Sequence, residues 1–207
     1  FYQGEYYIGT YGGGMMVLNP ETLWLKYFSQ SDTELFQKGH IFCVKPDTKG
    51  NLWIGTSQGL FNYNGQTKQI KHFTSANSQL PEGSVYEVSF DSTGKGWIAT
   101  ETGMCIYDPA SQNLGSNVFP EGFVYKDKVR TIYEDSEHNL YFIREKGSLF
   151  TSTLTMDRFY NQSVFSTLPD NTLMAIVEDK QGWLWVGSND GLQRIKKDGE
   201  DYDAFPF

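Results

Sequence analysis

The sequence has few of the residues from which metal and redox sites are built. It contains two cysteines and three histidines in 207 residues. Cys43 and Cys105 lie in apolar stretches without a CxxC spacing, which predicts buried free thiols and leaves a disulfide between them open. His40, His72 and His138 occupy unrelated positions, so they do not form a recognisable ligand set. We therefore expect no metal site and no cofactor.

Long apolar runs and an excess of positive charge are also missing. No stretch of about eighteen apolar residues occurs, so no segment is expected to span a bilayer. Seventeen Lys and Arg against 25 Asp and Glu give a formal net charge of -8. This balance disfavours nucleic acid and anionic lipid as partners, because phosphate binding needs a basic face. No signal peptide is recognisable, and a chain that starts at Phe1 is expected to be processed or trimmed.

Recognisable catalytic motifs are absent as well. The sequence contains no GxSxG nucleophile motif, no P-loop and no dinucleotide-binding fingerprint. The stretch "GTYGGG" (9–14) has the glycines of a phosphate loop, but it aligns with ordinary turns and does not open a helix. We therefore assign no catalytic residue. The composition, 39% hydrophobic and 16% aromatic, instead suits one globular domain with a packed core.

What the sequence does contain is an internal repeat of 44 residues. Three sets of positions keep this interval, and they are Asp47, Asp91, Asp135 and Asp179; Trp53, Trp97, Tyr141 and Trp185; and Gly59, Gly103, Gly147 and Gly191. An earlier, incomplete copy starts near Tyr6, at what would be the second strand of the unit. A period of this length is typical of a repeat architecture rather than of a catalytic site.

Each repeat reads as four short strands. In the third copy, 84–91, 97–100 and 104–108 are rich in β-branched and aromatic residues, and turn-forming residues separate them from a fourth segment at 114–119. Such strands pair as an antiparallel meander, which is one blade of a β-propeller. We expect an all-β propeller with four full blades of about 44 residues and one partial blade. The expected blades are 1–28 (partial), 29–73, 74–119, 120–160 and 161–207.

The repeated residues have structural interpretations. The aromatic residues Trp53, Trp97 and Trp185 are expected to wedge between neighbouring blades. Gly55 and Gly187 are expected to leave room for a neighbouring backbone or ring. The second glycine set, with Gly59, is expected to supply a positive φ in a tight turn. The aspartates are expected to hold turns by bonding their own backbone, which makes them structural rather than catalytic.

These residues also carry a family resemblance. "LPDNTLMAIVEDKQGWLWVGSNDGLQRI" (168–195) and the stretch 41–73 resemble two-component regulator propeller repeats. Members of that family form the extracytoplasmic sensor region of hybrid two-component histidine kinases, and many recognise oligosaccharides. The resemblance implies a non-enzymatic periplasmic sensing module whose ligand controls a cytoplasmic kinase. Rings of this family usually close with seven blades, so the chain is expected to be a fragment of a larger propeller.

The expected ligand contacts are departures from the repeat. In the fourth unit Ile143 replaces the first glycine, and charged residues fill the next turn. The candidates for ligand binding are Arg144, Glu145, Lys146, Glu101, Arg130 and Tyr125. Tyr125 and Trp24 are able to stack on a sugar ring, although a solvated turn and ordinary blade packing stay open as alternatives.

The sequence leaves two other functions open and also predicts that the chain associates with itself. A propeller enzyme of the polysaccharide lyase or glycosidase type is one alternative, because function lives in sites grafted on a fold. A scaffold for protein partners is another. An incomplete ring exposes a blade face and an inner strand edge, which predicts self-association of the fragment.

Overall fold

The computed structural model describes residues 1–28, 39–115, 128–144, 149–153, 159–162, 173–189, 191–197 and 202–206. Of residues 150, 153, 159–162, 202–204 and 206 only the backbone is described. These ranges form strands, turns and bridges and contain no helix. Accordingly, no helix in the described ranges has the length and apolar character needed to cross a membrane.

The strands form five antiparallel sheets in chain order. The first sheet has three strands, β1 (Tyr6–Gly9), β2 (Met15–Leu18) and β3 (Leu25–Tyr27). The second contains β4 (Ile41–Pro46), β5 (Asn51–Thr56), β6 (Gly59–Asn64) and β7 (Ile70–Phe73). The third contains β8 (Val85–Phe90), β9 (Gly96–Thr100), β10 (Gly103–Asp108) and β11 (Asn113–Gly115). The fourth contains β12 (Val129–Glu134), β13 (Asn139–Arg144), β14 (Leu149–Thr153) and β15 (Phe159–Gln162). The fifth contains β16 (Leu173–Glu178), β17 (Leu184–Ser188), β18 (Gly191–Ile195) and β19 (Tyr202–Pro206).

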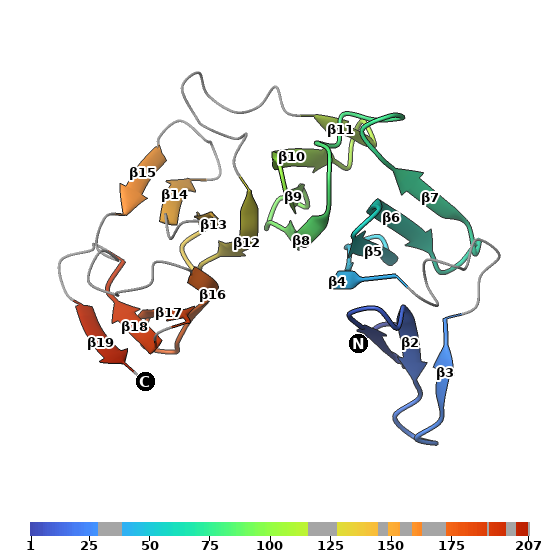
Figure 1. Cartoon of the computed structure of the whole chain (residues 1–207), viewed down its shortest axis with the longest axis horizontal. Helices are drawn as coiled ribbons and strands as arrows, with labels where there is room; N and C mark the ends of the chain where they lie inside the picture. Colours follow the sequence, from blue (N-terminus) through green and yellow to red (C-terminus); the bar gives the residue numbers. More distant parts are fainter. Residues whose placement is uncertain are drawn as a thin grey trace.

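The sheets fan around an open centre (Figure 1). The first strands of the full sheets, β4, β8, β12 and β16, contact one another in sequence and lie nearest the centre. Strands β7, β11, β15 and β19 lie on the periphery. The arc is open between the first and the fifth sheet, and the two chain ends lie on either side of this opening. The predicted all-β propeller with four full blades and one partial blade is therefore confirmed.

The core consists of apolar clusters between neighbouring sheets. Trp53 of the second sheet packs with Val85 and Val88 of the third, and its side chain is 1% exposed. Trp97 likewise packs with residues of the fourth sheet. Each wedge thus buries the face of one blade against the next, because a single sheet with two apolar faces needs a neighbour on each side. Trp185 belongs to the last sheet, which has no following neighbour in the structure, and is only half-buried.

Each aromatic wedge is also clasped by the aspartate six residues before it. In the second blade, Oδ1 of Asp47 accepts the backbone N–H groups of Lys49 and Asn51 at 2.9 and 2.8 Å, which closes the turn. Oδ2 of Asp47 accepts the indole Nε1–H of Trp53 at 3.0 Å. The same bond recurs in the other three full blades, from Trp97 to Asp91 (2.7 Å), Tyr141 to Asp135 (3.0 Å) and Trp185 to Asp179 (2.7 Å). The sequence analysis anticipated the turn but not the bond to the ring.

Close approach explains one of the repeated glycines. A Cβ added to Gly55 would lie 2.7 Å from the backbone oxygen of Val85 in the next blade, so only glycine fits there. At Gly187, on the last sheet, the nearest atom to such a Cβ is a Leu192 side-chain carbon at 3.6 Å, an ordinary contact. Gly59 has a φ of 108°, as a tight turn between β5 and β6 requires. Gly147 lies outside the described residues.

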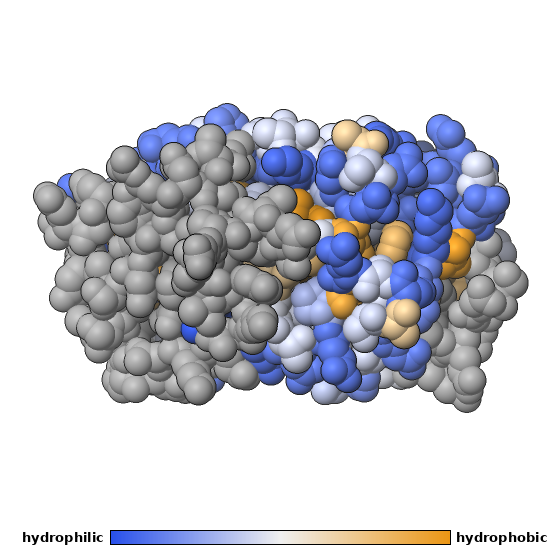
Figure 2. All heavy atoms as spheres, turned by 90° about the horizontal axis from the view of Figure 1, so that it is seen from above, coloured by the Kyte–Doolittle hydropathy of each residue, from blue (hydrophilic) through white to orange (hydrophobic). Residues whose placement is uncertain are grey.

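Apolar side chains are exposed on the two sheets that border the opening. On the first sheet Tyr6 is 46% and Ile8 39% exposed, and on the last sheet Val177 is 54% and Leu192 40% exposed. By contrast, hydrophilic residues cover most of the described surface on the outer side near β7 and β11 (Figure 2). The exposed apolar faces are those that meet a neighbour at every internal junction. They are therefore unfinished blade interfaces.

Candidate functional site

Each full blade carries a β-bulge near the start of its inner strand. The pairing register shifts between Ile41 and Cys43, and equivalent shifts occur in the other three inner strands. The residues inside these shifts are Phe42, Tyr86, Arg130 and Met174. A bulge adds one residue to a strand and re-aims its side chain, and bulges are common beside binding sites. The fold therefore presents one re-aimed side chain per blade at the same height.

The re-aimed side chains contact one another across blade junctions. The rings of Phe42 and Tyr86 lie 5.1 Å apart between centroids. On the other side of Tyr86, the guanidinium carbon of Arg130 lies 5.6 Å and the ammonium of Lys128 5.2 Å from the ring centroid. Both are cation–π distances. Tyr86 is thus held between an aromatic ring and two cations, all from inner strands or the residues that lead into them.

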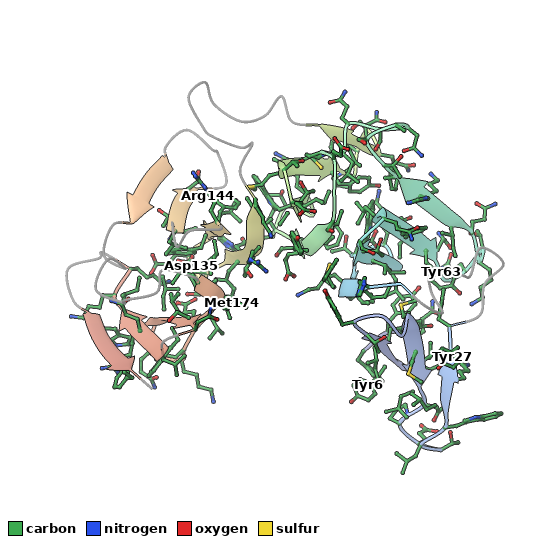
Figure 3. All side chains as sticks on the ribbon, viewed as in Figure 1. Tyr6, Tyr27, Tyr63, Asp135, Arg144 and Met174 are labelled. Carbon is green, nitrogen blue, oxygen red and sulfur yellow. The ribbon has the colours of Figure 1, made fainter. Side chains whose placement is uncertain are left out.

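The contacts continue in both directions along the arc. His40 stacks on Phe42 with 6.4 Å between centroids, and Tyr11 of the partial blade lies 4.1 Å from His40. At the other end, the Thr131 hydroxyl donates a hydrogen bond of 3.2 Å to the backbone oxygen of Met174. Met174 lies at the inner edge of the last sheet, toward the open centre of the arc (Figure 3). We call this surface the bulge ladder, and its members are Tyr11, His40, Phe42, Tyr86, Lys128, Arg130 and Met174.

The bulge ladder combines exposed rings with positive charge. Tyr11 is 82% and Met174 47% exposed, while the members between them are half-buried. Glu87, a carboxylate that directly follows Tyr86, forms an ion pair of 3.1 Å with Lys45. Burial raises the pKa of Glu87 even though Lys45 opposes the shift. The ladder therefore offers aromatic faces and hydrogen-bond donors on a protein whose overall charge is negative.

The sequence-predicted contacts divide between the ladder and other places. Arg130 is a ladder residue. Arg144 pairs in register with Val129, the residue before Arg130, so its backbone lies at the same end of the blade. Its side chain lies on the side of β14, farther from the centre of the arc than Met174 (Figure 3). Glu101 exchanges contacts with Ser84, whose N–H lies 3.4 Å from the Glu101 carboxylate, and shapes the entry to β8.

The remaining sequence candidates are placed elsewhere or are not described. Glu145, Lys146 and Tyr125 lie outside the described residues. Trp24 is 74% exposed in the turn between β2 and β3, away from the inner strands.

Arg144 replaces a turn-closing hydroxyl. In the neighbouring blades the equivalent residue closes its turn, as Thr56 does with a hydrogen bond of 2.8 Å to the Gly59 oxygen and Thr100 with one of 2.9 Å to the Gly103 oxygen. An arginine lacks the short hydroxyl that makes this bond. The departure noted in the sequence thus replaces the hydroxyl that closes this turn in the neighbouring blades with a guanidinium group.

The aromatic residues of the bulge ladder were not predicted, although the sequence carries a signal for them. Residues on one face of a strand normally alternate with a period of two. In three of the four inner strands the buried apolar residues are three apart, as in Val85 with Val88 and Val129 with Ile132, whereas in β4 the buried residues Ile41 and Cys43 are two apart. The spacing of three marks the inserted residue of a bulge.

Comparison with protein families gives one match. The model of a family described as two component regulator propeller matches residues 36–58 and 167–190. Comparison with curated proteins gives no match. The two matched stretches contain the first two strands of the second sheet, β4 and β5, and of the fifth sheet, β16 and β17.

Comparison with solved structures gives propellers. The extracellular domain of the hybrid two component system BT4673 from B. thetaiotaomicron superposes with a TM-score of 0.81 at 19% identity, over 99% of this chain and 26% of that one. A second structure of the BT4673 extracellular domain, there called a one component system, gives a TM-score of 0.80 at 21% identity over 97% and 26%. Virginiamycin B lyase from Staphylococcus aureus, with quinupristin, gives 0.72 at 12% identity over 95% and 64%.

These likenesses establish the architecture. At such identities they show a shared fold, and the chain spans about a quarter of the length of the BT4673 domain. The repeat match adds the type of blade. The chain is a partial β-propeller, and residues 36–58 and 167–190 of it match the two component regulator propeller family.

Proposed function

We propose that the chain is a non-enzymatic ligand-sensing module of an extracytoplasmic receptor of the hybrid two-component type, and that it recognises an oligosaccharide on the bulge ladder. One observation carries the proposal: the bulge recurs at the same position of four inner strands, and three of the inserted residues, Phe42, Tyr86 and Arg130, have side chains in contact across the blade junctions. Packing alone does not need an extra residue at this point in every blade.

The chemistry of the ladder supports a sugar ligand. Phe42 and Tyr86 present neighbouring rings, and aromatic faces pack well against the C–H faces of sugars. Lys128 and Arg130 add donors for hydroxyl or acidic groups of the same ligand. Because the rungs extend over several blades, the surface suits a chain of sugars better than a single ring.

The same surface gives little support to glycoside hydrolysis. That reaction ordinarily needs two carboxyl groups placed on either side of the bond. The seven ladder residues include no carboxylate, and Glu87 beside them is paired with Lys45. The likeness to virginiamycin B lyase extends to the fold, so it brings no catalytic group to this chain.

The position of the ladder supports a role in receptor signalling. It crosses the junctions between blades, so a bound ligand favours one arrangement of neighbouring blades over another, and this difference is what a receptor transmits. The match to two component regulator propeller repeats and the likeness to the extracellular domain of BT4673 support a periplasmic sensor with a cytoplasmic kinase partner.

The proposal is tested by screening the chain against an array of neutral and acidic oligosaccharides. Wild-type protein is expected to retain a subset of glycans, and Tyr86→Ala is expected to lose them. Tyr27→Phe, on the opening-side sheet, is the control and should bind as wild type does. Absence of binding to every glycan, or full binding by Tyr86→Ala, contradicts the proposal. Product formation from a retained glycan would favour the enzyme alternative.

A further inference from the structure

Two pockets occur at the same place in successive blade junctions. The first, of about 230 Å³, lies between the first and second sheets and includes Tyr63 and Lys68 in its lining. The second, of about 280 Å³, lies between the second and third sheets and includes Tyr107 and Gln112. Tyr107 and Gln112 are the repeat equivalents of Tyr63 and Lys68, since both pairs are 44 residues apart. The pockets are therefore two versions of one architectural feature.

The first pocket is satisfied by its own side chains. Glu5 and Lys26 in its lining form an ion pair of 3.2 Å. Val17, also in the lining, is 2% exposed and belongs to the apolar cluster between the sheets. The carboxylate, the ammonium group and the apolar side chain of this pocket therefore all have partners within the chain.

The second pocket replaces these groups with amides. Asn62 stands where the first pocket has Val17, and Asn51 where it has Glu5, whereas Lys71 keeps the place of Lys26. The lysine has thus lost the partner that its equivalent has. At the third junction the corresponding residue is Ile106, which is 5% exposed in an apolar cluster. Blade packing is therefore satisfied by an apolar residue here, and the amide of Asn62 calls for another explanation.

The side-chain nitrogen of Asn62 is an unused donor. It is buried from solvent and has no hydrogen-bond partner in the described structure. The neighbouring amides are engaged, because Asn51 donates to Asp47 at 2.7 Å and accepts from Asn64 at 2.9 Å. A buried donor without a partner is unfavourable, so such a group in a pocket points to a ligand that accepts from it.

We propose that this pocket, the amide pocket, binds a small polyhydroxylated anion. Asn62 donates to the ligand, and Lys71 supplies charge that attracts it. Lys49, the second lysine of the lining, adds to this charge, and its ammonium group also donates to the Pro109 backbone oxygen at 2.9 Å. Tyr107, whose ring lies 4.4 Å from that of Trp53 between centroids, forms an aromatic wall for a ring-shaped ligand. No carboxylate lines the pocket among the described residues, which favours an anion over a cation. The volume suits one sugar ring with an acidic group rather than a chain.

The amide pocket is separate from the bulge ladder. Phe42 lies at the start of β4, whereas Asn51 begins β5, at the other end of the same hairpin. The two sites therefore lie at opposite ends of the blade. Binding at one does not require the other, so the inference goes beyond the proposed function and can fail or stand by itself.

The test is a titration of the 207-residue chain with glucuronate, glucose 6-sulfate and glucose. Binding is monitored by calorimetry and by the fluorescence of the tryptophans. At least one anion is expected to bind tenfold or more tightly than glucose. The two anions distinguish a carboxylate from a sulfate ligand. Asn62→Val, which restores the residue of the first pocket, is expected to weaken anion binding at least tenfold.

A pair of lysine variants provides a second, matched test. Lys71→Met is expected to remove the preference for anions over glucose, whereas Lys26→Met, at the equivalent place of the first pocket, should leave it unchanged. Tyr86→Ala should also leave anion binding unchanged, which separates this site from the bulge ladder. The inference is overturned if wild-type protein binds neither anion at tens of millimolar, or if Lys71→Met and Asn62→Val bind both anions as wild type does.

Discussion

The hydroxyl of Tyr141 donates a hydrogen bond to Oδ2 of Asp135 at 3.0 Å, where the other full blades use the indole N–H of a tryptophan. The fourth blade has therefore kept the bond while exchanging the ring. Asp135 is 4% exposed, and a buried carboxylate needs a donor for each oxygen. The repeat thus requires an aromatic residue that carries a polar hydrogen, which explains why phenylalanine does not occupy this position in any full blade.

Removing that hydrogen is expected to destabilise the fold. Tyr141→Phe deletes only the donor and leaves the ring in place, so we expect the free energy of unfolding in urea to fall by about 1–3 kcal/mol. Tyr27→Phe, whose side chain is 56% exposed, serves as the control and should change it little. An unchanged unfolding midpoint for Tyr141→Phe would mean that the clasp contributes nothing to stability.

The clasps and the ion pairs between blades also predict a loss of stability in acid. A hydrogen bond from Lys197 lowers the pKa of Glu178, and one from Trp185 lowers the pKa of Asp179. A carboxyl group with a lowered pKa stabilises the fold above its unfolded pKa of about 4, and this stabilisation is lost as the pH falls through the folded value. We therefore expect the free energy of unfolding to decrease below about pH 4.

Lys197→Met tests the cause of this acid sensitivity. The variant lacks the bond to Glu178, at 2.8 Å, so its stability should depend less on pH between about 3 and 5. Lys26→Met removes an exposed pair and serves as the control, with a pH dependence close to that of wild type. Identical pH profiles for Lys197→Met and wild type would show that the ion pair between Lys197 and Glu178, both in the fifth blade, does not shape the acid response.

The two thiols are expected to be inert in the folded protein. Burial raises the pKa of both Cys43 and Cys105 to about 12, and the thiolate is the reactive form of cysteine. At pH 8 a thiol reagent such as DTNB should label the native chain slowly and label both residues at once in urea. Fast labelling of the native chain would show that one of these junctions opens readily.

The exposed faces of the first and last sheets predict association of the chain. Ile8 and Leu192 lie on these faces and are 39% and 40% exposed. We expect the weight-average mass in sedimentation to rise with concentration, and the double substitution Ile8→Lys with Leu192→Lys to reduce that rise. Thr48→Lys, which adds a charge at an exposed residue in the turn between β4 and β5, is the control. A monomer at all concentrations for the wild type would show that the open faces do not associate.

The sequence was informative wherever a feature repeats at a fixed interval. The 44-residue spacing of Asp47, Trp53 and Gly59 with their equivalents was enough to predict the blades, because each blade must solve the same packing problem. The contacts between aromatic rings of neighbouring blades were harder to predict from the sequence. Phe42 and Tyr86 belong to different blades, and their contact depends on the bulges. A spacing of three between buried residues marks the bulge at Tyr86 but not the one at Phe42, where the buried residues Ile41 and Cys43 are two apart.

The amide pocket was not predicted from the sequence, for a different reason. Its meaning comes from comparing Asn62 with Val17, but the first repeat carries an extra residue, so these positions are 45 apart and lie outside the regular interval. In addition, an asparagine in a strand has no pattern that separates an exposed amide from a buried, unpaired one. Only the neighbours in space make that distinction.

The central claim is that the bulge ladder recognises a glycan. The most direct measurement is the dissociation constant of the glycan that binds the wild type best, compared between Tyr86→Ala, Arg130→Ala and the control Tyr27→Phe. The account predicts that each ladder variant weakens binding about tenfold or more, equivalent to about 1.4 kcal/mol, while the control matches the wild type. Equal dissociation constants for all four proteins would contradict it.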